Sequence, residues 1–182
     1  MRADAKKNYE QILGAARDLL ATGGADASLR DIARTAGVGL GTMHRHFPTR
    51  EVLLEALLRD SFDQLGIRAG ELERADRSDA ALVSWLREIV AIAHKYSGAI
   101  KSMVAAIEDE GSALHASCVS MKAAGTRLLV RAQAEGKART DIDGADLFAL
   151  VGALAWIKDQ SALAQRSDHI FAIVTDAILA KP

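Results

Sequence analysis

Several residue types and patterns are scarce in this 182-residue sequence, and their scarcity excludes whole classes of protein. The single cysteine, Cys118, cannot form an internal disulfide, so the fold does not depend on a disulfide framework. The longest apolar run, 147–157, is too short to cross a bilayer as a helix, which takes about 20 residues. The first residues, MRADAKKNYEQ, lack the apolar core of a signal peptide. We therefore expect a cytoplasmic protein that makes no membrane contact.

Helix breakers and β-forming residues are also rare. The chain has two prolines and eight aromatic residues, and alanine and leucine dominate a composition that is 49% hydrophobic and 26% charged. Continuous β-branched runs are absent, which favours helices over strands. The sequence predicts an all-α protein of about nine helices, with a small N-terminal three-helix module followed by a larger helical bundle.

The first seventy residues contain four helical segments with clear start and stop signals. Apolar residues at helical spacing predict helices at 7–21, 29–36, 39–46 and 49–70. Gly23 and Gly24 end the first, and Ser28 is placed to cap the second with Asp31 three residues on. Gly37 permits a tight turn, Pro48 stops the third helix and Thr49 caps the fourth. Two short helices around a glycine turn are typical of a helix-turn-helix, although ordinary helical hairpins share that pattern.

The remaining sequence predicts five more helices separated by polar or glycine breaks. We expect them at 78–96, 98–109, 112–135, 145–165 and 168–180, with Gly136 ending the third of these. Ser167 or Asp168 is expected to cap the last one. The helices at 145–165 and 168–180 are apolar on more than one face, which predicts that they are covered by a second copy of the chain or by a larger core.

Charge is distributed unevenly along the chain although its net value is −1. Residues 1–50 hold eight Lys/Arg and five Asp/Glu, a net charge of +3, whereas residues 51–182 hold fifteen and nineteen, a net charge of −4. A basic end is suited to a polyanion such as DNA. The N-terminal part is therefore the candidate nucleic-acid module.

The segment SLRDIARTAGVGLGTMHRHFPTREVLLEAL, at 28–57, resembles the DNA-binding domain of the TetR family of transcriptional regulators. The residues that carry the resemblance keep their order without gaps: Ile32, Ala33, Ala36, Gly37, Val38, Gly41, Thr42, His46, Phe47, Leu53 and Leu54. The later helices resemble, more weakly, family members with an SbtR-type effector domain. The resemblance implies a helix-turn-helix DNA-binding domain at 1–48 and an effector-binding and dimerisation domain at 49–182.

This resemblance also implies DNA contacts for individual residues. Arg45 suits bidentate contact with guanine or, equally, a phosphate contact; Leu40 and Gly41 approach base edges, and the Thr42 hydroxyl suits a phosphate. The flanking set suits phosphate contacts and consists of Arg30, Thr49 and Arg50. His44 stands where the family usually has tyrosine, which leaves the usual contact at that position in doubt.

The family resemblance further implies a homodimer, formed through the helices at 145–165 and 168–180, that binds a pseudo-palindromic double-stranded DNA operator and releases it when a small molecule binds. An apolar effector would have a pocket walled by the larger side chains of the middle helices, most of which also suit an ordinary core: Phe62, Trp85, His94, Met103, Met121 and Trp156. Helix 49–70 would transmit the change between the domains.

Two other functions fit parts of the sequence. His115 and Cys118 are three residues apart, on one side of the same helix, and His94 could join them as a third metal ligand. A small metal-assisted enzyme is therefore one alternative. The sequence has no Gly-rich phosphate loop, HExxH pair or GxSxG elbow, so we predict no enzyme activity, no cofactor and no metal. The other alternative is a DNA-binding activator or organiser that responds to no effector.

Overall fold

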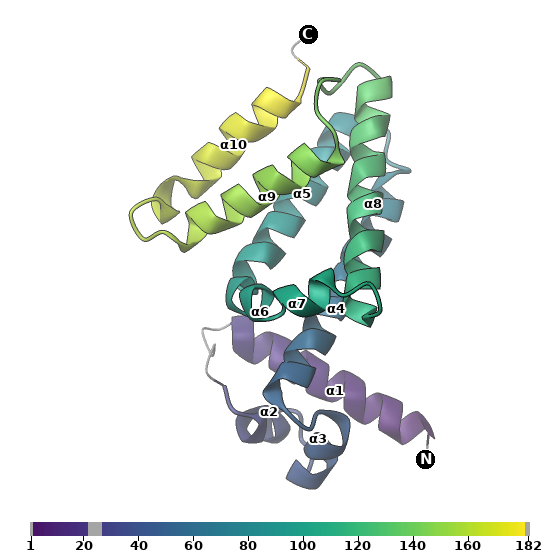
Figure 1. Ribbon diagram of the computed structural model, residues 1–182, viewed down its shortest axis with the longest axis vertical. Helices are drawn as coiled ribbons and strands as arrows, with labels where there is room; N and C mark the ends of the chain where they lie inside the picture. Colours follow the sequence, from purple (N-terminus) through teal and green to yellow (C-terminus); the bar gives the residue numbers. More distant parts are fainter. Residues whose placement is uncertain (1, 22–26, 181–182) are drawn as a thin grey trace. The chain divides into compact units, whose positions relative to one another are not determined.

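The computed structural model describes residues 2–21 and 27–180, and within them the protein is all-α (Figure 1). These residues form ten α-helices and one short 3₁₀ helix, and their one β-type pairing is an isolated bridge between Ala138 and Leu179. The all-α prediction is therefore confirmed. No helix in this part of the chain is long and apolar enough to span a bilayer.

The chain divides into two compact units, Met1–Leu58 and Arg59–Pro182, whose boundary falls inside one helix. The first unit holds α1 (Arg2–Ala21), α2 (Leu29–Thr35), α3 (Leu40–His46) and the start of α4 (Arg50–Leu72). Its buried core combines side chains from all four helices: Ile12, Ala16, Ile32, Ala33, Met43, Phe47, Leu53 and Leu57. The sequence placed the domain boundary earlier, at the residue before α4 begins.

The helix ends of the first unit follow the signals in the sequence. Ser28 Oγ accepts a hydrogen bond from the Asp31 amide (3.2 Å), and Asp31 Oδ2 accepts one from the Ser28 amide (3.3 Å), so the predicted cap is a complete capping box. Gly37 adopts φ = +68°, which only glycine does without strain. Thr49 Oγ1 accepts from the Val52 amide at the start of α4. Gly23 and Gly24 lie outside the described residues.

In the second unit, α5 packs against both α8 and α9. Its elements are α5 (Ser78–Lys95), α6 (Ser97–Ser102), α7 (Val104–Glu108), α8 (Ala113–Ala134), α9 (Gly144–Asp159), the 3₁₀ helix Ala164–Arg166 and α10 (Ser167–Ile178). Figure 1 shows α10 running beside α9, with α8 on the other side of α9. Trp85 on α5 is fully buried, and its Nε1 donates to the Leu65 carbonyl of α4 (2.9 Å).

Three details of the second unit differ from the prediction. The helix expected at 98–109 is split at Met103, whose side chain is buried while its backbone leaves helical geometry, and no glycine or proline signals this break. The helix expected to reach residue 165 ends at Asp159, because Gln160 turns to extended backbone. The prediction that Ser167 or Asp168 caps the last helix was wrong, because Arg166 holds that position without a side-chain hydrogen bond.

Candidate nucleic-acid interface

Helix α3 is fixed in place by one buried face. Met43 and the residue after the helix, Phe47, expose 0% and 1% of their surfaces. The Tyr9 ring of α1 stacks on Phe47 with a centroid separation of 5.1 Å, and it meets the His46 ring edge-on at 6.1 Å. These contacts pack one face of α3 against α1, so the opposite face of α3 is exposed to solvent.

The outward face of α3 carries the residues predicted to contact DNA. Leu40, Gly41, His44 and Arg45 are exposed, and Thr42 is half-buried. Arg45 Nε donates to the Gly41 carbonyl (3.2 Å) and Arg45 Nη2 donates to Thr42 Oγ1 (3.2 Å). The structure thus brings the guanidinium of Arg45 together with the first turn of its own helix. Their contacts with DNA stay predictions.

The polar residues that flank α3 differ in their exposure and in whether they already have an intramolecular partner. Arg30 on α2 is exposed, Arg50 is half-buried, and the Thr49 hydroxyl is engaged in capping α4. Arg34 pairs with Asp31 (3.3 Å). The hydrogen bond from Ser28 holds the pKa of Asp31 below its ordinary value, and the ionised Asp31 carboxylate offsets the charge of Arg34. Of the two arginines on α2, Arg30 is therefore better suited to phosphate.

The six residues predicted to wall an effector pocket separate into two groups. The side chains of Phe62, Trp85, Met103 and Met121 are buried in the second unit. His94 is half-buried, with its Nδ1 2.8 Å from Asp159 Oδ1, and Trp156 on α9 is 56% exposed. The structure therefore buries four of the six, leaves His94 half-buried and exposes Trp156.

The residues of the metal alternative do not converge. His115 Nδ1 lies 2.7 Å from the Ile107 carbonyl, and Cys118 is buried, which raises the pKa of its thiol. Within residues 2–21 and 27–180, no three His, Cys, Asp or Glu side chains are grouped as metal ligands. His115 instead joins α8 to the end of α7.

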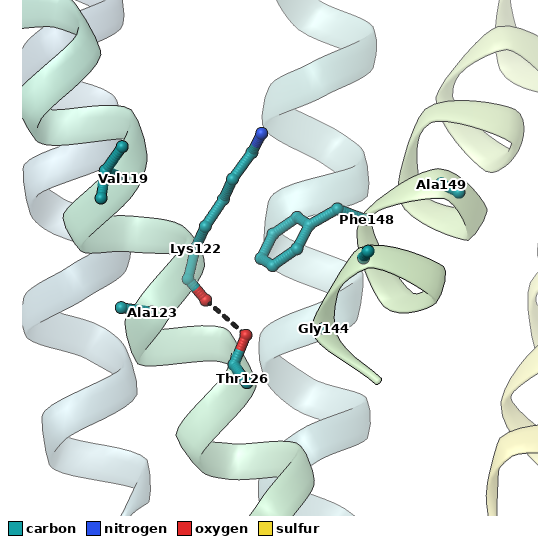
Figure 2. Close-up of a pocket in the computed structure, with 8 residues that line it drawn as sticks. Val119, Lys122, Ala123, Thr126, Gly144, Phe148 and Ala149 are labelled. Carbon is teal, nitrogen blue, oxygen red and sulfur yellow. Dashed lines mark hydrogen bonds between the residues drawn. The ribbon is translucent and has the colours of Figure 1, made fainter. Parts of the chain in front are cut away.

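A hollow of about 670 Å³ lies between α8 and α9, and no motif in the sequence predicts it (Figure 2). It is lined by Val119, Lys122, Ala123, Thr126, Gly144, Ala145, Phe148 and Ala149. Lys122 Nζ lies 5.9 Å from the centre of the Phe148 ring, and Thr126 Oγ1 donates to the Lys122 carbonyl (3.0 Å). A Cβ at Gly144 would stand 2.3 Å from Thr126 Oγ1, so glycine permits this close approach of the helices.

Tyr96, at the junction of α5 and α6, is a second feature that sequence reasoning missed. Its side chain is buried, and among the described residues its hydroxyl is the buried side-chain polar atom with no hydrogen-bond partner. A buried hydroxyl without a partner costs about 1–3 kcal/mol. Such a group marks a place where a polar atom of a ligand or a water molecule would be stabilising.

Two family models match the chain and together cover most of it. Residues 12–57 match the model for bacterial regulatory proteins of the tetR family, and residues 77–179 match that for the SbtR-like transcriptional regulator C-terminal domain. The second match alone spans more than half of the chain. The chain belongs to the TetR family of transcriptional regulators. This confirms the resemblance noted in the sequence and the prediction of a regulator rather than an enzyme.

Individual members of the TetR family are similar over different lengths. The TetR regulator SCO0520 of Streptomyces coelicolor is 30% identical, with a TM-score of 0.77 over 96% of this chain and 99% of that one. The regulator SAR0097 of Staphylococcus aureus is 36% identical over 73 residues, 39% of this chain and 38% of that protein.

The repressor LfrR of Mycolicibacterium smegmatis is 42% identical over 64 residues, 35% of this chain and 32% of that protein. The matches to these two curated relatives thus span about a third of each relative's length. The structure of LfrR in complex with proflavine is 26% identical, with a TM-score of 0.66 over 97% of this chain and 98% of that one.

Proposed function

We propose that this TetR-family chain is a ligand-released repressor that binds a pseudo-palindromic operator as a homodimer. The observation that carries the proposal is that α3 has one buried face and one exposed, partly basic face. Met43 and Phe47 anchor the helix in a small core, and the exposed Leu40, His44 and Arg45 stand on its other side. A short helix held in this way is suited to lie in the major groove. Such a repressor would act in the cytoplasm, where the bacterial chromosome lies.

In the proposed repressor, Arg45 recognises a guanine, because its guanidinium can contact the guanine O6 and N7 atoms together. Its hydrogen bonds to Gly41 and Thr42 hold it along α3 in the absence of DNA. Leu40 suits a thymine methyl group, and Arg30 and Arg50 contact phosphates on either side. The Thr49 hydroxyl caps α4, so its contribution to phosphate binding is smaller than that of the arginines.

Dimerisation is supported by the apolar surfaces that α9 and α10 leave exposed. Trp156 on α9 is 56% exposed and Ile173 on α10 is 54% exposed, although both belong to predominantly apolar helices. Association of α9 and α10 with the same helices of a second copy would remove this surface from water. A dimer also presents two copies of α3 to successive major grooves, about 34 Å apart.

Release by a small molecule is supported by the interior of the second unit. Phe62, Trp85, Met103 and Met121 supply apolar surface there, and Tyr96 offers an unpaired hydroxyl. The related repressor LfrR has been crystallised in complex with proflavine. We propose that a largely apolar effector binds a state of the dimer in which the spacing of the two α3 helices does not match successive major grooves. Effector and operator therefore exclude each other.

Two measurements test the proposed function in sequence. Selection of bound fragments from random DNA, followed by footprinting, should give an inverted repeat with half-sites about one helical turn apart. Titration of a compound panel that includes proflavine into the protein–operator complex should then release the DNA. Failure to select any sequence would refute the DNA-binding role. An operator that stays bound in the presence of every compound that binds the protein would instead favour an effector-independent activator or organiser.

A further inference from the structure

Helix α9 presents a stripe of very small side chains that ends in one large one. Residues 145, 149, 152, 153 and 156 fall on a single helix face, and all five are exposed. Four of them are alanine or glycine, and the fifth is Trp156. The stripe holds no charged group. Such a face lets a second helix approach closely at its small residues while the indole projects beyond them.

Gly152, in the middle of this stripe, has no explanation inside the unit. A Cβ added there would meet no atom within 4 Å, and the helix gains about 1 kcal/mol from alanine over glycine at an exposed interior position. Gly144 and Gly125, by contrast, are required by side chains that approach them from within the unit. The absence of a side chain at Gly152 makes structural sense if something outside the unit lies against it.

The hollow between α8 and α9 opens on the same stripe. Ala145 and Ala149 belong both to the stripe and to the lining of the hollow, and Phe148 forms its aromatic wall (Figure 2). Trp156 lies seven residues beyond Ala149, about 10 Å along the helix. The side chain is therefore too far away to fill the hollow of its own chain. One surface thus carries an apolar projection at one end and an apolar recess at the other.

A two-fold axis brings these two features together. In a two-fold interface, a contact of residue i with residue j of the partner is repeated as j with i. If two α9 helices cross antiparallel at Gly152, a residue four positions after Gly152 lies opposite the residue four positions before it. Trp156 is therefore opposite Phe148. The same symmetry operation that buries one indole buries the other.

We infer that, in the proposed homodimer, Trp156 of each subunit inserts into the α8–α9 hollow of its partner and packs against Phe148. This inference rests on the proposed dimer and adds its register and its main contact. The indole would contact the Phe148 ring, with the Lys122 ammonium at the edge of the same aromatic cluster. Trp156 then acts as an interface residue, rather than as the pocket wall predicted from the sequence.

Disulfide trapping tests the register directly. In a Cys118→Ala background, the double variant Trp156→Cys/Ala149→Cys should form a covalent dimer on mild oxidation, and so should the single variant Gly152→Cys at the axis. Trp156→Cys alone and Ala149→Cys alone should stay uncrosslinked, because the antiparallel register keeps each residue well away from its own copy. Crosslinking of Trp156→Cys alone, or no crosslinking of the double variant, would overturn the inference.

Truncation of the indole tests its energetic role. Trp156→Ala should weaken dimerisation by about 100-fold or more, measured by sedimentation, because two buried tryptophans are lost per dimer. Ile67→Ala is the matched control, since Ile67 is equally exposed (57%) and lies on α4, and it should leave the dimer unchanged. Equal effects of the two variants would contradict the inference. Both residues are exposed, so neither change removes core packing, and equal melting temperatures of the monomeric states would verify this.

Measuring the oligomeric state and the tryptophan quenching of the unmodified protein tests this inference separately from the proposed repressor function. Trp85 is fully buried, so acrylamide quenching of tryptophan fluorescence reports mainly on Trp156. A dimer with weak quenching supports the inference. A dimer with strong quenching and no 149–156 crosslink refutes the inference and leaves the proposed repressor intact. A chain that sediments as a 19.4 kDa monomer at every concentration refutes the dimeric repressor itself.

Discussion

The two units of this regulator differ in how far apart in the sequence their hydrogen-bonded residues lie. In the first unit, the hydrogen bonds that shape the candidate DNA interface join residues three or four apart, such as Ser28 with Asp31 and Arg45 with Thr42. In the second, Trp85 bonds to the carbonyl of Leu65, 20 residues away, and Ser78 bonds to Glu135, 57 residues away. Local hydrogen bonds thus set the helix ends and the Arg45 side chain of the candidate DNA interface, whereas the second unit depends on hydrogen bonds between residues far apart in the sequence.

The largest effect is expected where two distant helices meet. A Cβ at Gly125 on α8 would stand 2.3 Å from the ring of the buried Trp85 on α5, closer than real Cβ contacts. Gly125→Ala should therefore destabilise the second unit by about 3 kcal/mol, because the indole cannot move without losing its bond to Leu65. Urea unfolding followed by tryptophan fluorescence measures the loss.

Gly66→Ala is the control for that experiment. A Cβ at Gly66 on α4 meets no atom within 4 Å, so alanine should stabilise the helix by up to about 1 kcal/mol. Opposite signs for the two glycines would support long-range packing as the organising feature of this unit. If both changes stabilise the protein, α8 and α5 do not approach as closely as described.

The next effect concerns DNA affinity rather than folding. Arg45→Ala should weaken operator binding by about 1–3 kcal/mol per half-site and relax the preference at a single base pair. Arg34→Ala should have a much smaller effect, because Arg34 is paired with Asp31. Fluorescence anisotropy against the operator and against versions substituted at each position measures both. A uniform loss across all sequences would assign Arg45 to a phosphate instead of a base.

The same contrast explains how much of the molecule could be predicted from its sequence. The cap at Ser28 and the turn at Gly37 were both predicted, because each depends on residues a few positions away. The break at Met103 and the end of α9 at Asp159 were not predicted, because no local residue signals them and tertiary packing decides them. The hollow lined by Phe148 and the unpaired Tyr96 hydroxyl likewise exist only once distant helices are assembled.

Two N-cap serines allow a smaller and sharper comparison of the units. Ser28→Ala should cost about 1 kcal/mol, because its hydroxyl serves only the first turn of α2 and Asp31. Ser112→Ala should cost more, about 2 kcal/mol, because the Ser112 hydroxyl accepts from the His115 amide and also donates to the Ala106 carbonyl of α7. Chemical unfolding of both variants measures the difference. Equal losses would mean that the link to α7 contributes nothing.

The Ser28 box should also respond to acid in a defined direction. The pKa of Asp31 is lowered in the folded state by its hydrogen bonds to Ser28. Its contribution to stability is therefore fully present above the ordinary pKa of an aspartate, and it is lost as the pH falls through the lowered value. The stability difference between the unmodified protein and Ser28→Ala should accordingly be constant near neutral pH and shrink under strongly acidic conditions. A difference that grows on acidification would contradict this assignment.

The smallest effect, and the one with the most informative sign, is expected at Tyr96. Tyr96→Phe removes a buried hydroxyl that has no partner, so the variant should be as stable as the unmodified protein or more stable by up to about 1 kcal/mol. Thermal melting in the absence of added compounds measures this. A clear loss of stability would mean that an ordered water satisfies the hydroxyl. If the variant is at least as stable but no longer responds to compounds that release the operator, the hydroxyl binds the effector, and the second unit retains an unsatisfied group because its ligand supplies the partner.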